Sequence, residues 1–188
     1  MGYNQFRSDL EAKGRKDMLE DFPIKFNKDS KQETSAGNNL LEAGKGKLLS
    51  AEYDQIFHTT VARGLYVSKR ACLDIHPTIT ILASRVREPT ESDWKKCVCM
   101  VRYLFCTSLY HLTLSTESLR VMNWMIDASF AVHPDFKRHT GGTLSFGGGA
   151  AQVMSKKQKL NSRSSTEAEL TAVDNVVTMI LWTKLFME

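Results

Sequence analysis

Residues 121–131, VMNWMIDASFA, and residues 164–170, SSTEAEL, decide the fold that the sequence predicts. The first stretch alternates between apolar and polar side chains in the manner of a β-strand, and it carries Asp127. The second has Ser164 three residues before Glu167, which is the capping-box pattern at the start of a helix. A strand, a hairpin and then a helix indicate an α+β fold for this half of the chain.

The residues around these two stretches complete the predicted sheet. Residues 110–115 and 119–127 alternate like strands, and residues 142–155 are typical of a hairpin with a run of three glycines at its turn. The helix that begins after Ser164 is expected to pack through one apolar stripe, formed by Leu170, Val173, Val177 and Ile180.

The region upstream of the sheet is predicted to be helical. Apolar side chains lie three and four residues apart over residues 53–67. Pro77 opens a second helix and Pro89 ends it, while Thr90 and Asp93 form a capping box for a third. The apolar face expected on the third helix consists of Trp94, Val98, Val101, Leu104 and Phe105. Residues 1–50 have little periodicity and are interpreted as a linker with one apolar segment, residues 18–26, that forms a strand or an extended contact.

Composition sets broad limits on function. The 188 residues carry a net charge of +4, which is compatible with a polyanionic partner but does not require one. No run approaches the roughly 18 apolar residues of a membrane span, so no membrane partner is expected. The N-terminus is polar and lacks an apolar signal core. The cysteines have no metal-binding spacing and are expected to be buried thiols in a reducing, intracellular compartment: Cys72, Cys97, Cys99 and Cys106.

Asp127 and Glu169 are the candidate metal-binding residues. A carboxylate on a strand facing one in the first turns of a helix can hold a divalent cation. The alternative is structural, because Asp127 then ends a strand and Glu169 is stabilised by the helix dipole. Glu167, at the capping-box position, is interpreted as a helix cap and not as a metal ligand.

From residue 53 to residue 188 the chain resembles the pol polyprotein of copia-type long-terminal-repeat retrotransposons. The segments that carry the resemblance are FHTTVARGLYVSKRACLDIHPTI, REPTESDWKKCVCMVRYL, DASFAVHPDFKRHTGG and SKKQKLNSRSSTEAEL. The resemblance implies that the chain has three parts: a linker or extended segment (1–50), a helical reverse transcriptase connection (51–112) and a truncated ribonuclease H-like antiparallel sheet with one helix (113–188).

The resemblance also implies a role for the two carboxylates. Asp127 matches the first-strand metal-binding aspartate of ribonuclease H, and Glu169 matches its helix glutamate. Such a site cuts RNA in an RNA–DNA hybrid with two Mg²⁺ or Mn²⁺ ions held by four carboxylates. The family's other two carboxylates fall beyond Glu188, so an incomplete and inactive site is expected.

The basic segment KKQKLNSR, residues 156–163, follows the predicted hairpin. Lys156, Lys157, Lys159 and Arg163 either contact nucleic-acid phosphates or form a solvated loop. Three hypotheses for the whole chain stay open: an inactive fragment of the polyprotein, a non-catalytic module that binds nucleic acid or the rest of a reverse transcriptase, and a decayed fragment without function.

Overall fold

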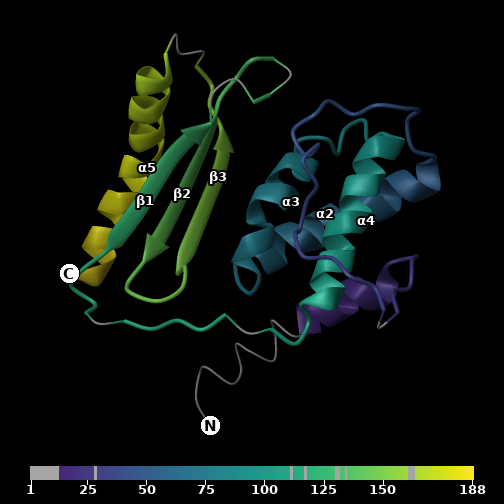
Figure 1. Cartoon of the computed structure of the whole chain (residues 1–188), viewed down its shortest axis with the longest axis horizontal. Coiled ribbons are helices and arrows are strands. Elements are labelled where there is room, and N and C mark those ends of the chain that lie inside the picture. The colour runs from purple at the N-terminus through teal and green to yellow at the C-terminus, as the bar shows by residue number, and fades with distance from the viewer. Residues whose placement is uncertain are drawn as a thin grey trace. The chain divides into compact units, whose positions relative to one another are not determined.

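The computed structural model describes residues 13–27, 29–110, 112–116, 118–129, 132–133, 135–160 and 164–188. The chain forms two compact units, residues 1–111 and residues 112–188. The first is helical, and the second combines a three-stranded antiparallel sheet with one helix (Figure 1). The α+β class predicted from the sequence is therefore confirmed.

The first unit is built on α2 (Ala51–Ser68), the short 3₁₀-helix η1 (Leu73–Ile75), α3 (His76–Ala83) and α4 (Glu91–Cys106). The predicted starts of α3 and α4 are correct. Pro77 lies in the first turn of α3, and the Thr90–Asp93 capping box is present at α4. Side chains from all of these elements form one core that includes Phe57, Val61, Ile75, Ile79, Leu82, Cys97, Met100, Val101 and Leu104.

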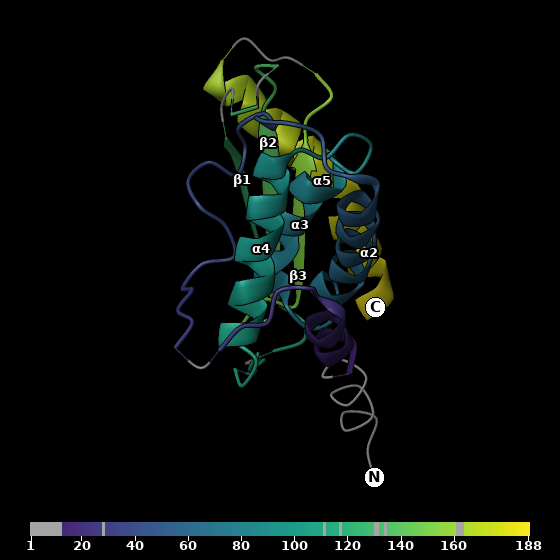
Figure 2. The same cartoon turned by 90° about the vertical axis from the view of Figure 1, so that its right-hand side faces the viewer.

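The N-terminal segment is part of this core. Residues 13–21 are helical, in place of the strand or extended contact predicted for residues 18–26 (Figure 1). Met18 and Phe22 are 2% and 1% exposed, and the Phe22 ring stacks on Trp94 with 5.4 Å between ring centroids. Figure 2 shows the same helix in the view turned by 90°. The described part of residues 1–50 thus supplies apolar side chains that α4 packs against.

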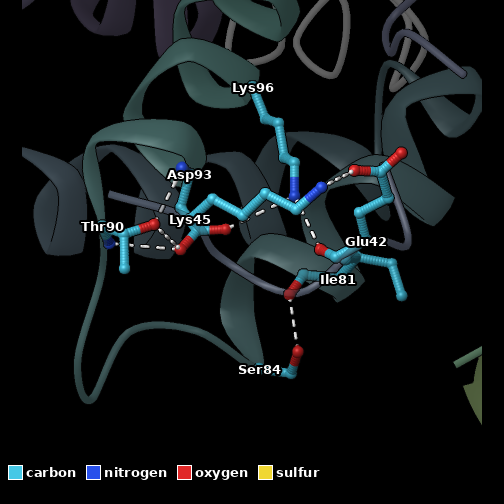
Figure 3. A network of polar contacts seen from close by, with 7 residues as sticks. All are labelled: Glu42, Lys45, Ile81, Ser84, Thr90, Asp93 and Lys96. Atoms are coloured by element: carbon cyan, nitrogen blue, oxygen red, sulfur yellow. Dashed lines mark hydrogen bonds and ion pairs between the residues drawn. The ribbon is translucent and has the colours of Figure 1, made fainter. Parts of the chain in front are cut away.

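A buried polar network fixes the loop before α2 to the start of α4 (Figure 3). Lys96 donates a hydrogen bond to the backbone carbonyl of Glu42 (2.9 Å) and lies 3.6 Å from the Asp93 carboxylate. The Asp93 carboxylate also accepts hydrogen bonds from the backbone and hydroxyl of Thr90. Since the Lys96 and Asp93 side chains are 5% and 1% exposed, each charge depends on the other and on these backbone partners.

The second unit contains β1 (Asn123–Ser129), β2 (His139–Ser145) and β3 (Gln152–Lys157), in the spatial order β1-β2-β3. The predicted hairpin is confirmed, with Gly147, Gly148 and Gly149 in the turn between β2 and β3. No strand is present over residues 112–116, so the prediction there was wrong. This segment makes a single backbone bond to the turn, from Ser115 to Gly148, and not a ladder.

Helix α5 (Ser165–Met187) covers one face of the sheet, and its Ser164 cap is confirmed. The predicted packing stripe was wrong, because Leu170, Val173 and Val177 are exposed. The residues that α5 buries lie on a different face and include two alanines: Ala168, Ala172, Val176 and Thr183. By length and composition alone, α5 is also apolar enough to cross a membrane. Counting uninterrupted apolar residues missed this property, because single polar residues interrupt the helix.

Gly149 is expected to be indispensable to the β2–β3 turn. It has a positive φ of 79°, and a Cβ atom there would overlap the backbone carbonyl oxygen of Thr113. Gly149→Ala is therefore expected to lower the free energy of unfolding of the second unit by roughly 2 kcal/mol or more. Urea denaturation measures this change. Gly141→Ala is the control, because a Cβ atom at Gly141 meets nothing within 4 Å. Equal effects of the two substitutions would contradict the turn geometry.

Candidate functional site

Asp127 lies on the uncovered face of the sheet. Its neighbour Ile126 pairs with Gly142, where a Cβ atom would lie 3.4 Å from Val176 of α5, so Ile126 faces the helix. Because side chains alternate along a strand, Asp127 projects from the opposite face. The Asp127 side chain is exposed and accepts a hydrogen bond from the backbone of Ala128 (2.9 Å).

Glu169 is an exposed residue in the second turn of α5. Within the ranges that the structure describes, no group of three or more His, Cys, Asp or Glu side chains could hold a metal ion. Mg²⁺ prefers octahedral coordination by oxygen atoms, which two exposed carboxylates do not provide. The described residues therefore do not fit a two-metal centre, and the role of Asp127 and Glu169 in metal binding stays a prediction.

The predicted basic segment begins at the end of β3. Lys156 and Lys159 are exposed, and neither takes part in an ion pair with the described part of the chain. Lys157 forms an ion pair with Asp135 (2.7 Å), and Lys137 lies 3.9 Å from the same carboxylate. The hydrogen bond from Lys157 lowers the pKa of Asp135. Arg163 lies outside the described residues. This basic edge, defined as Lys137, Lys156, Lys157 and Lys159, contains four cations and one carboxylate in contact with them.

A chain of polar side chains crosses the same uncovered face. The Oγ of Ser155 on β3 lies 2.6 Å from Nε2 of His139 on β2. The other nitrogen of His139, Nδ1, lies 3.0 Å from Nε2 of His133. Ser155 and His133 are both buried, and Asp127 lies one strand away across Gly141. Each imidazole nitrogen of His139 thus has a partner.

Sequence reasoning missed this polar chain. Ser155 and His139 are 16 residues apart, and only the register of the hairpin brings them together. That register pairs Gly141 with Ser155 and His139 with Lys157. A hairpin centred on the three glycines predicts the same pairing, so the signal was present in the turn.

Acid is expected to destabilise the second unit through His139. Burial, and then the nearby His133, lower the pKa of His139 from 6.5 to about 4. Between pH 6.5 and pH 4, His139 is therefore protonated in the unfolded chain and neutral in the folded chain. The free energy of unfolding falls as the pH falls from 6.5 towards 4. Urea unfolding across this range, followed by Trp124 and Trp182 fluorescence in a Trp94→Phe background, measures the loss. His139→Gln should remove part of the pH dependence, and an unchanged profile would contradict the assignment.

The first unit has an open pocket of about 400 Å³ beside the N-terminal helix. Its lining includes the apolar side chains of Leu19, Phe26 and Phe105 and the basic side chains of Arg15, Lys16 and Lys25. None of the candidate metal-binding or nucleic-acid-binding residues predicted from the sequence lines this pocket.

Fold and site together define an α+β protein with a basic sheet edge and a polar chain on an uncovered sheet face. Over 110 residues it is 27% identical to the secreted RxLR effector protein 161 of Plasmopara viticola, an alignment that covers 58% of this chain and 78% of that protein. No family model matches the chain, and no solved structure matches it.

These comparisons contradict the retrotransposon assignment. The matched relative is a secreted effector and not a reverse transcriptase, a ribonuclease H or any part of a pol polyprotein. The predicted function as a polyprotein fragment and the predicted intracellular localisation are contradicted with it. An aspartate on a strand and a capped helix recur in many α+β proteins, since both follow from local backbone chemistry. The short segments quoted above therefore predicted secondary structure better than they predicted a family.

Proposed function

We propose that this chain binds nucleic acid through the basic edge of its second unit. The observation that carries the proposal is the placement of four lysines around the end of β3, where Asp135 is the one carboxylate among the described residues in ion-pair contact with them. Lys156 and Lys159 are exposed and are free to contact phosphates. The net charge of +4 favours the approach of a polyanion.

The expected binding mode is electrostatic and independent of sequence. Lysine is a point charge that contacts phosphates without reading base edges. The name of the relative, a secreted effector, describes no ligand, so the charges alone support nucleic acid as the ligand.

We propose that the strands and the helix of the second unit are arranged as in the first part of a ribonuclease H-like domain. The order β1-β2-β3 with α5 on one face is compatible with the first part of a ribonuclease H-like sheet. The likeness concerns the arrangement of the strands and the helix and implies no catalytic activity. Binding of Mg²⁺ or Mn²⁺ at Asp127 or at Glu169 is a separate proposal. The expected affinity is weak, because Asp127 projects from the face of the sheet opposite α5 and Glu169 lies on α5. Titration of the metal into the protein, into Asp127→Asn and into Glu169→Gln tests it.

Reversal of two exposed charges is expected to weaken nucleic-acid binding. In Lys156→Glu/Lys159→Glu, the affinity for a labelled 20-nucleotide duplex should fall roughly tenfold at low salt, and the salt slope should shrink by about 1–2. Fluorescence polarisation with DNA, RNA and hybrid duplexes measures both quantities. Because the contacts are to phosphates, all three duplexes should respond alike.

The matched control is Lys16→Glu/Lys184→Glu, which changes the net charge equally at exposed residues that do not belong to the basic edge. If the control weakens binding as much as the test variant, net charge and not the basic edge is responsible. Salt-independent binding by the native chain would also overturn the proposal. Binding to vesicles of anionic lipid that exceeds binding to every duplex would assign the edge to a membrane surface instead.

A further inference from the structure

We propose that Ser155 is a nucleophile activated by His139, and that the uncovered face of the sheet carries an acyl-transfer site for simple esters. This inference is independent of nucleic-acid binding at the basic edge. It rests on the geometry of Ser155, His139 and His133 and on the space beside them.

The first support is the relation between nucleophile and base. The distance of 2.6 Å between Ser155 Oγ and His139 Nε2 is a short hydrogen bond between a hydroxyl and an imidazole. A hydroxyl is a weak nucleophile until such a base removes its proton. The two residues lie on neighbouring strands of one hairpin, so the ladder holds them in position.

The second support is the group that orients the base. His133 Nε2 lies 3.0 Å from His139 Nδ1. When His139 carries its proton on Nδ1, the Nδ1–H group donates a hydrogen bond to His133 Nε2, and His139 Nε2 is left free to accept the proton of Ser155. His133 is a positioning residue in this scheme, and its own backbone is fixed by hydrogen bonds with Phe136 and Lys137.

The third support is access to the hydroxyl. Ser155 pairs directly with Gly141, and the position of a Cβ atom at Gly141 has no neighbour within 4 Å. The place beside Ser155 that a side chain would fill is therefore open. An ester carbonyl of small size can approach Oγ through this space, although Ser155 as a residue is 8% exposed.

The neutral form of His139 is also favoured. Burial and the neighbouring His133 lower the pKa of His139 to about 4, so the imidazole is unprotonated at neutral pH. A base must be unprotonated before it can accept a proton.

The reaction is a two-step ester hydrolysis. Ser155 Oγ bonds to the ester carbonyl carbon, its proton passes to His139 Nε2, and the proton then leaves with the alcohol as the ester C–O bond breaks. In the second step water attacks the acyl carbon and gives a proton to His139 Nε2. The bond to Ser155 Oγ breaks, and that proton returns to Oγ, so enzyme and base are restored.

The test is covalent labelling of the full chain by a fluorophosphonate probe, with the labelled residue located by peptide mass spectrometry. One phosphonyl group is expected on Ser155. His139→Gln should slow labelling roughly a hundredfold, because it removes the base. Ser129→Ala, which removes an exposed serine from the same sheet, should not change the rate.

A second readout separates a chemical role from a structural one. The labelling rate of the native chain should fall as the pH drops below that at which His139 is neutral, and circular dichroism should show that each variant is folded. Release of p-nitrophenol from p-nitrophenyl acetate should be lost in Ser155→Ala. Absence of labelling, labelling at another residue, or equal rates for the native chain and His139→Gln would each overturn the proposal.

Discussion

Replacing Lys96 with methionine is expected to lower the free energy of unfolding of the first unit by about 3–5 kcal/mol, because the Asp93 carboxylate then stays buried without its cation. The Lys96 side chain is 5% exposed and that of Asp93 is 1% exposed, so water cannot compensate the lost charge. The backbone carbonyl of Glu42 would also lose its donor. Urea denaturation followed by Trp94 fluorescence, in a Trp124→Phe/Trp182→Phe background, measures the change.

Lys95→Met is the matched control for this prediction. Lys95 is the preceding residue of α4 and is exposed, so the same substitution there should change stability by no more than about 0.5 kcal/mol. Adding Asp93→Leu to Lys96→Met should recover part of the lost stability, because no charge is then left unpaired. If Lys96→Met is as stable as Lys95→Met, water reaches the Lys96–Asp93 pair and the prediction is wrong.

Truncating Phe22 to alanine is expected to cost about 3–5 kcal/mol in the same unit. Phe22 is 1% exposed and packs between Trp94 of α4 and Phe26. Its removal leaves a cavity at the contact between the N-terminal segment and α4. The same denaturation experiment applies, and the emission of Trp94 should shift as its ring becomes more accessible to water.

Ile24→Ala is the control, because Ile24 belongs to the same segment and is 36% exposed. It should cost well under half as much as Phe22→Ala. Similar small effects at both positions would mean that the segment does not pack on α4 in solution, and that the linker predicted from the sequence describes it better.

The parts of the fold that follow from local chemistry were predicted correctly. The caps at Thr90 and Ser164 and the turn at Gly147–Gly149 depend on a few neighbouring residues, and each is present. The face of α5 was predicted wrongly because the helix is apolar on most sides. Its periodicity selects no single face, and packing against the sheet selects the small side chains.

The candidate site was less accessible to sequence reasoning. The two carboxylates, Asp127 and Glu169, were placed on the expected elements, but their joint role depended on a family that the comparisons contradict. The pairing of Ser155 with His139 required the register of a hairpin, and the hydrogen bond from Lys96 to the Glu42 carbonyl required the path of a loop. The hairpin register follows from the glycine turn, whereas the loop contact has no signature in a local window of residues.

The small side chains under α5 have a consequence for how the protein tolerates mutation. Ala168 and Ala172 are almost fully buried, whereas Leu170, Leu181 and Leu185 are more than half exposed. The size of the side chains is therefore restricted where α5 packs against the sheet, whereas their polarity is nearly unrestricted on the side of α5 that faces away from the sheet. In a deep mutational scan, alanine-to-leucine changes in this helix should be more harmful than leucine-to-lysine changes. The usual rule that large apolar residues in a helix are the sensitive ones would then be reversed.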